Sequence, residues 1–167
     1  MKKLFLAFVV TIFITNQTGA QKIIPIEYNG KKYEAIDMTS KGKITWGGNN
    51  EEVTGKAAQS ESNGAANTKA IVAFVGNNEE FDSKPYAAKL CNELKIGNKT
   101  DWYLPSKDES DAIYAFKEKF NVEERGSIWT STEANANQAV SKYWYTGDFY
   151  NVQKVDNYQF VCIRKVE

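Results

Sequence analysis

The chain has 167 residues with a hydrophobic content of 42%, which suits one domain with one core. Its 21 basic and 21 acidic residues cancel to a formal charge of zero, which argues against nucleic acid or an anionic membrane surface as a general partner. The chain has no histidine, and this excludes Ser-His and Cys-His catalytic pairs and histidine-ligated zinc.

Residues 1–20 have the pattern of a secretory signal peptide. Lys2 and Lys3 precede an apolar run over residues 4–14, and small residues end the segment. A membrane-spanning helix needs about 20 apolar residues, so this run is too short to be an anchor. We therefore expect a mature chain from residue 21 without a transmembrane segment, exported to the periplasm, the cell surface or the medium.

Short β-strands are expected in residues 21–43, which lead into a domain spanning residues 44–167. Several β-branched and aromatic residues flank Asn29 and Gly30, the dipeptide that is typical of a tight hairpin turn. The polar, glycine-rich stretch Gly47–Asn67 has no clear periodicity and predicts a long, irregular loop.

Two helices are predicted. The first covers residues 84–96 and presents one apolar face, and the second covers residues 106–120. Ser106 and Glu109 have the spacing of a capping box, in which each side chain bonds to a backbone N–H at the start of the helix. Pro105 favours an extended chain immediately before this start.

Three apolar, β-prone runs follow the second helix and are separated by turn-rich segments. They are Ile128–Thr132, Tyr143–Thr146 and Phe160–Ile163. Strands on both sides of two helices, without an internal repeat, predict an α+β domain.

The two cysteines favour one structural disulfide, because an exported chain meets an oxidising environment. Cys91 lies on the apolar face of the first predicted helix, and Cys162 lies in the last predicted strand. The alternative is a pair of small buried thiols. Neither residue has a CxxC partner, which argues against a catalytic role.

Several short motifs occur in an order that resembles the Lcl C-terminal domain family, a bacterial family of largely unknown function. The resemblance covers residues 44–166. The motifs are Trp46-Gly47, Thr54-Gly55, Gly64-Ala65-Ala66-Asn67-Thr68, Ala87-Ala88-Lys89-Leu90-Cys91, Asp101-Trp102-Tyr103-Leu104-Pro105-Ser106, Trp129-Thr130-Ser131-Thr132-Glu133 and Cys162-Ile163-Arg164.

The resemblance implies a C-type lectin-like fold, with short twisted antiparallel strands, two helices and long irregular loops. It also implies a Cys91–Cys162 bridge from the first helix to the last strand. Family members occur on secreted or surface proteins, and some resemble glycan-binding adhesins, which implies carbohydrate binding or adhesion. This chain departs from the family pattern at Ser110, where an apolar residue is usual, and at Thr130, where serine is common.

The matching motifs supply a set of residues that we expect to have a structural role. Arg164 is expected to pair with a carboxylate, and the short polar residues next to Trp129 to bond loop backbone. The full set is Asp101, Trp102, Leu104, Pro105, Ser106, Glu109, Trp129, Ser131, Glu133 and Arg164.

Aromatic residues crowd around a turn near the end of the chain, where side chains are hard to bury. This turn is the candidate ligand-binding surface, with a purely structural turn as the alternative. The candidate residues are Tyr143, Tyr145, Asp148, Phe149 and Tyr150.

The tryptophans offer a second way to bind a sugar, by stacking. Trp102, Trp129 and Trp144 could line such a face, since an indole ring is flat and apolar with a polar N–H. Tryptophans in strands more often belong to the core, which is the interpretation we favour here.

Metal binding and catalysis are not predicted. The Glu-Pro-Asn and Trp-Asn-Asp signatures of calcium-dependent sugar-binding lectins are absent, so no metal or other cofactor is expected. Asp108, Glu109 and Asp111 are explained as acids that favour the positive end of a helix. Nothing in the sequence selects the pair of carboxylates that a glycosidase needs.

The sequence therefore predicts an exported, non-catalytic binding or adhesion module whose partner is a glycan or another surface polymer. One alternative is a structural module that docks an envelope protein in a surface assembly. Another is a hydrolase that uses paired carboxylates.

Overall fold

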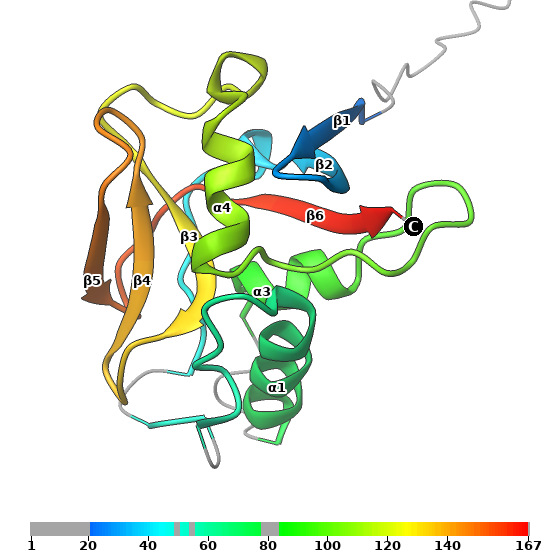
Figure 1. Ribbon diagram of the computed structural model, residues 1–167. Coiled ribbons are helices and arrows are strands. Elements are labelled where there is room, and N and C mark those ends of the chain that lie inside the picture. The colour runs from blue at the N-terminus through cyan, green and yellow to red at the C-terminus, as the bar shows by residue number, and fades with distance from the viewer. Residues whose placement is uncertain (1–20, 49–50, 54–55, 78–83, 167) are drawn as a thin grey trace, which may run out of the picture.

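The computed structural model confirms an α+β fold with two small antiparallel sheets and, among the described residues, three α-helices (Figure 1). It describes residues 21–48, 51–53, 56–77 and 84–166. The predicted signal peptide, residues 1–20, and the Thr54-Gly55 motif lie outside these ranges. No helix in the described ranges is long and apolar enough to cross a membrane.

The first sheet joins the two ends of the described chain. Strand β1 (Ile23–Tyr28) pairs with β2 (Lys31–Asp37), and β2 pairs with β6 (Val161–Val166) on its other side. The predicted hairpin turn is confirmed, since Asn29 and Gly30 have φ angles of 50° and 71°, both in the left-handed region. The strands in residues 21–43 are therefore paired into the same sheet as the last strand.

The second sheet contains β3 (Ser127–Glu133), β4 (Gln138–Tyr143) and β5 (Phe149–Gln153), in that order. The strand predicted at 128–132 is confirmed as β3. The strand predicted at 143–146 is wrong, because β4 ends at Tyr143 and the next residues form the turn into β5. A run of aromatic residues thus marks a hairpin end here and not a strand.

Helix α1 (Gly64–Gly76) is not predicted by the sequence, which indicates a loop as far as residue 67. The helix begins after Asn63, whose side chain accepts a hydrogen bond from the N–H of Ala66. Earlier in the chain, a short 3₁₀ segment, Thr39–Lys41, follows β2. The expected loop is therefore shorter than predicted.

The other two helices occur where they are predicted but are shorter. Helix α3 covers Ala87–Asn92, against the expected 84–96. Helix α4 covers Lys107–Tyr114 and is followed by the 3₁₀ segment Lys117–Lys119, against the expected 106–120. Both hydrogen bonds of the predicted capping box at the start of α4 are present.

Two hydrophobic clusters cover the two faces of the first sheet. One contains Ile36 of β2 with Trp46, Trp102 and Trp129, and it lies toward α1 and α3. The other contains Tyr33 of β2 and lies toward α4. In Figure 1, α4 lies between the first sheet and the β3–β5 sheet. It contacts β1 on one side and β3 and β4 on the other.

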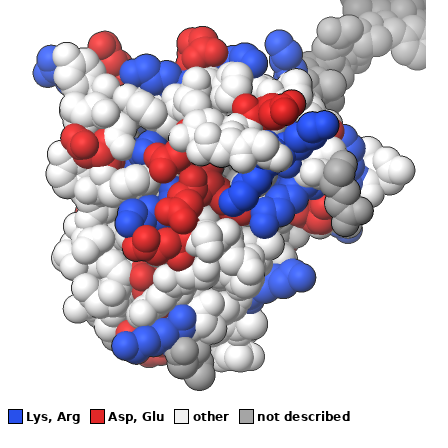
Figure 2. Space-filling view, in the orientation of Figure 1, with Lys and Arg blue, Asp and Glu red and all other residues white. Residues whose placement is uncertain are grey.

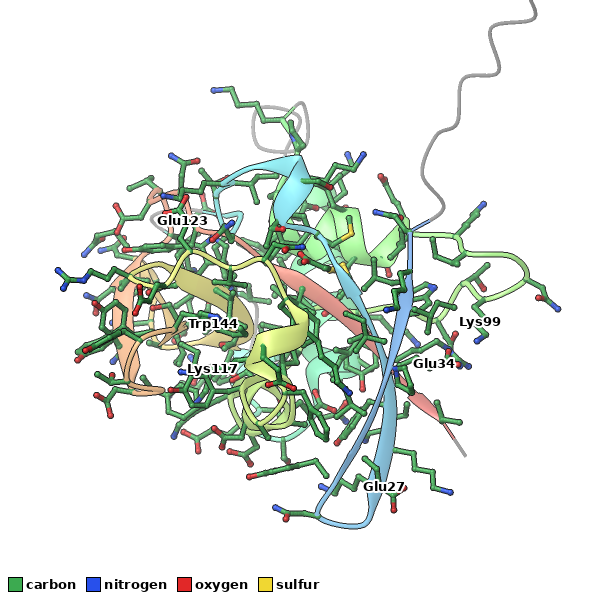
Figure 3. The ribbon with its side chains drawn as sticks, turned by 90° about the horizontal axis from the view of Figure 1, so that it is seen from above. Glu27, Glu34, Lys99, Lys117, Glu123 and Trp144 are labelled. Atoms are coloured by element: carbon green, nitrogen blue, oxygen red, sulfur yellow. A yellow bond between two sulfur atoms is a disulfide. The ribbon has the colours of Figure 1, made fainter. Side chains whose placement is uncertain are left out.

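The predicted disulfide is confirmed. Cys91 of α3 and Cys162 of β6 are bonded, with their Cα atoms 5.3 Å apart, and both residues are fully buried. The yellow sulfur atoms in Figure 3 show the bridge between helix and sheet. Closing a loop of 71 residues stabilises the fold by about 4 kcal/mol in the chain-entropy account.

Candidate functional site

The hairpin between β4 and β5 carries three tyrosines, which we call the tyrosine surface: Tyr143, Tyr145 and Tyr150. The ring of Tyr143 lies 6.4 Å from that of Tyr145 and 6.1 Å from that of Tyr150. Tyr145 and Tyr150 are 52% and 51% exposed, although both side chains are large and mostly apolar. Such rings offer flat contact area with few rotatable bonds, which suits recognition.

A buried lysine lies beneath this hairpin. The side chain of Lys142 is only 1% exposed, and its Nζ lies 2.6 Å from Asp111 Oδ1 and donates to the carbonyl of Gly147 at 2.8 Å. The same ammonium lies 3.9 Å from the centre of the Phe149 ring and 5.0 Å from that of Tyr114. Lys142 therefore ties the hairpin to α4 through Asp111 and the Tyr114 ring, and it holds the turn through Gly147 and Phe149.

The turn itself also fits closely against α4. Gly147 has φ +82°, and a Cβ at this position would lie 2.6 Å from the ring of Tyr114. Tyr114 in turn donates from its hydroxyl to the carbonyl of Tyr145, at 3.3 Å. Asp148, a predicted contact residue, accepts from the Thr146 hydroxyl at 2.6 Å and remains exposed. The backbone that presents the tyrosine surface is thus held in one conformation.

The structure brings the five predicted ligand-binding residues together on this hairpin, but in two roles. Tyr145 and Tyr150 face solvent, and Tyr143 lies partly buried between them. Phe149 is partly buried over Lys142 and so supports the surface from below.

The tryptophans considered for sugar stacking belong to the core. Trp102, Trp129 and Trp144 are each at most 5% exposed, so they cannot stack on a ligand. Trp129 donates from its ring nitrogen to the carbonyl of Ile44 at 2.7 Å. Trp144, labelled in Figure 3, packs edge-on against Tyr114.

The segment from Asp101 to Ser106 connects three elements of the fold. The backbone of Tyr103 exchanges two hydrogen bonds with Ile163 of β6, and the backbone of Leu104 bonds to the Thr68 hydroxyl of α1. The carbonyl of Pro105 accepts from the N–H of Ser131 in β3 at 2.7 Å. This segment therefore has a structural role, connecting α1, β3 and β6.

The carboxylate of Glu109 connects this segment to the starts of two helices. One carboxylate oxygen accepts from the backbone N–H groups of Ser106 and Gly64 at 3.0 and 2.9 Å, which are at the starts of α4 and α1. The other accepts from the Tyr103 hydroxyl at 3.1 Å. Burial, together with the charge of Glu109, raises the pKa of Tyr103, so this hydroxyl keeps its proton.

A second buried lysine fixes the irregular loop after Trp46. Lys154 and Glu133 form an ion pair at 2.7 Å with both side chains fully buried. Lys154 also donates to the carbonyls of Gly48 and Glu51, and Glu133 accepts from the N–H of Val53. Burial lowers the pKa of Lys154, an effect opposed by its hydrogen bond to Glu133.

Arg164 pairs with carboxylates, as expected. Its Nε lies 2.6 Å from Asp101, and one terminal nitrogen lies 3.0 Å from Glu34. Figure 3 shows Glu34 and Lys99 lying close together, and they form a further ion pair at 2.6 Å. This cluster ties β2, β6 and the segment before α4 together at the surface.

Sequence reasoning did not identify Lys142, Lys154 or Tyr33 as important. Lys142 lies in β4, where the four consecutive residues 139–142 are all buried, and Lys154 lies in the turn after β5, so an alternating pattern marks neither lysine. Within the described residues, no group of three or more acidic or cysteine side chains is arranged to hold a metal ion.

No protein-family model matches the chain, and no curated protein matches it. The resemblance to the Lcl C-terminal domain family therefore stays a prediction from the motifs.

Proposed function

We propose that this protein is an exported binding or adhesion module with a C-type lectin-like fold, and that its tyrosine surface contacts a glycan or another surface polymer. The observation that carries the proposal is the pair Tyr145 and Tyr150, which are half exposed on a hairpin that is fixed from below. A fixed aromatic surface loses little conformational freedom on binding, which favours affinity. The disulfide supports export, since such bonds persist in oxidising compartments.

The first experiment is binding of the purified protein to an array of glycans and glycosaminoglycans, with calcium and again with chelator. We expect saturable binding that Tyr145→Ala and Tyr150→Ala each weaken by about tenfold, since a stacked ring contributes on the order of 1 kcal/mol. Val155→Ala is the matched control, because Val155 is 51% exposed in the turn after β5 and carries no ring.

Three results of the array would change this proposal. Equal loss in Val155→Ala would mean that the tyrosines are not the contact surface. Loss of binding with chelator would mean that a metal takes part. A blank array from folded protein would remove the glycan as the partner.

Docking of an envelope protein is the second candidate, and one observation favours it. Strand β5 is paired with β4 on one side, and no strand among the described residues pairs with its other side. Tyr150, Asn151 and Gln153 are exposed along it. A partner strand could add to this edge, with backbone hydrogen bonds giving affinity. Capture of a specific envelope protein that Asn151→Pro abolishes, with no glycan bound on the array, would support it.

A further inference from the structure

A polar pocket of about 250 Å³ lies between the β1–β2 turn and the start of α4. Its wall on the sheet side includes Asn29, Lys31 and Tyr33. Its wall on the helix side includes Asp108 and Glu109. Figure 2 shows that acidic side chains gather on the face that α4 presents, with basic side chains beside them. None of the three tyrosines of the tyrosine surface lines this pocket, although Asp111, which lines it, pairs with Lys142 beneath the hairpin.

Tyr33 is the residue that points to a ligand. It is 3% exposed and lines the pocket, and no described residue forms a hydrogen bond with its hydroxyl. Burial and the nearby charge of Glu109 raise the pKa of Tyr33, so the hydroxyl keeps its proton at neutral pH. The ring of Tyr33 is buried, whereas its hydroxyl is open to the pocket, so the hydroxyl is available to bond a ligand there.

Glu109 supplies a fixed acceptor in the same pocket. Its Oε2 accepts from two backbone N–H groups. Within the described part of the chain, Oε1 accepts only from Tyr103, with Lys165 Nζ at 3.9 Å. A carboxylate oxygen can accept more than one hydrogen bond, so Oε1 has capacity for a further donor. Its position is set by the starts of two helices, which makes it a rigid contact.

The charges of the pocket limit the class of ligand. Asp108, Glu109 and Asp111 oppose one lining lysine, Lys31, although Asp111 is already paired with Lys142. Asp108 is exposed and its carboxylate has no partner among the described residues. The surplus of negative charge disfavours an acidic ligand. The free carboxylate oxygens of Asp108 and Glu109 favour a ligand that donates hydrogen bonds.

We propose that this pocket binds one uncharged sugar unit through Tyr33, Glu109 and Asp108. A sugar hydroxyl both accepts and donates, so it can satisfy the Tyr33 hydroxyl and donate to a carboxylate at the same time. An ammonium group only donates, so it cannot accept a hydrogen bond from Tyr33. The inference rests on the pocket alone and does not depend on the tyrosine surface.

The test is a titration of the purified protein, followed by backbone NMR, with methyl glucoside, methyl galactoside, N-acetylglucosamine and glucuronate. At least one neutral sugar should shift the amides of Asn29, Ser62 and Asp108 in a saturable way. Glucuronate should bind at least about tenfold more weakly than the neutral sugar of the same ring, because of the acidic wall. Absence of pocket shifts with every neutral sugar, at concentrations up to tens of millimolar, would overturn the proposal.

Tyr33→Phe gives the sharpest variant, since it removes one oxygen and keeps the buried ring. Sugar affinity should fall by about tenfold, the usual consequence of leaving a polar group unpaired in a complex. The thermal midpoint should not fall, because the hydroxyl has no partner in the free protein. Val155→Ala should bind the sugar as the unaltered protein does. Unchanged affinity in Tyr33→Phe would overturn the proposal.

The positions of the shifts separate this inference from the proposed function. Shifts confined to Tyr145 and Tyr150 would support the tyrosine surface and overturn the pocket. Shifts confined to the pocket, with none at the hairpin, would support the pocket and overturn sugar binding at the tyrosine surface.

Discussion

The hairpin tip and the long loop are each held by one buried lysine, Lys142 near the end of β4 and Lys154 just after β5. Their acidic partners differ in exposure. Asp111, the partner of Lys142, is 42% exposed, whereas Glu133, the partner of Lys154, is fully buried. A charge left without its partner costs far more in the interior than where water can reach it. The long loop should therefore depend on its ion pair much more strongly than the hairpin does.

The largest expected effect comes from Glu133→Gln, which keeps the shape of the side chain and removes its charge. Lys154 would then be buried without a counter-charge, and the free energy of unfolding should fall by about 3 kcal/mol. Urea unfolding measures this change. Glu123→Gln is the control, because its ion pair with Lys43 joins side chains that are 58% and 46% exposed, so its loss should change stability by less than about 0.5 kcal/mol. Similar losses in the two variants would contradict the comparison.

The next effect is expected from Gly147→Ala at the hairpin tip. Alanine at φ +82° is strained, and its Cβ would lie against the Tyr114 ring, so stability should fall by about 2 kcal/mol. Gly76→Ala is the control, since a Cβ there meets no atom within 4 Å. Thermal unfolding of both variants checks this, and a loss in Gly76→Ala as large as that in Gly147→Ala would contradict it.

Lys142→Met should cost less, at about 1 kcal/mol, because methionine keeps the packing of the lysine stem and Asp111 can turn to water. The tip would lose its ties to Asp111 and Gly147, so binding at the tyrosine surface should weaken more than stability does. Paired measurements of urea unfolding and array binding check this. A loss of stability as large as that of Glu133→Gln would mean that exposure of the acid does not set the cost.

The parts of the fold that the sequence predicts are those specified by neighbouring residues. The Asn29-Gly30 turn and the capping box of Ser106 and Glu109 depend on residues at most three apart, and both are present. The sequence does not predict helix α1, because the start of this helix lies in a polar, glycine-rich stretch. It is held by distant contacts, among them the bond of Thr68 to Leu104.

The two proposed binding surfaces also differ in how far the sequence could predict them. The aromatic turn could be predicted from its residue types, because exposure at a turn is a local property. The pocket could not be predicted, since Tyr33 and Glu109 are far apart in the sequence and meet only when α4 packs on the first sheet. The pair of Lys154 and Glu133 could not be predicted either, because it forms only when the residues after β5 and the loop pack against β3.

Among these ion pairs, the surface cluster around Arg164 is expected to contribute least to stability. Hydrogen bonding to Arg164 lowers the pKa of Asp101, and hydrogen bonding to Lys99, then to Arg164, lowers that of Glu34. A carboxyl with a lowered pKa stabilises the fold above its ordinary pKa, and this stability is lost as the pH falls through the lowered value.

The difference in unfolding free energy between the unaltered protein and Arg164→Gln should therefore stay below about 1 kcal/mol near neutral pH. It should narrow as the pH falls from about 5 to about 3. Urea unfolding across this range measures the gap, and a gap that widened in acid would show that the cluster does not stabilise through its ionised carboxylates.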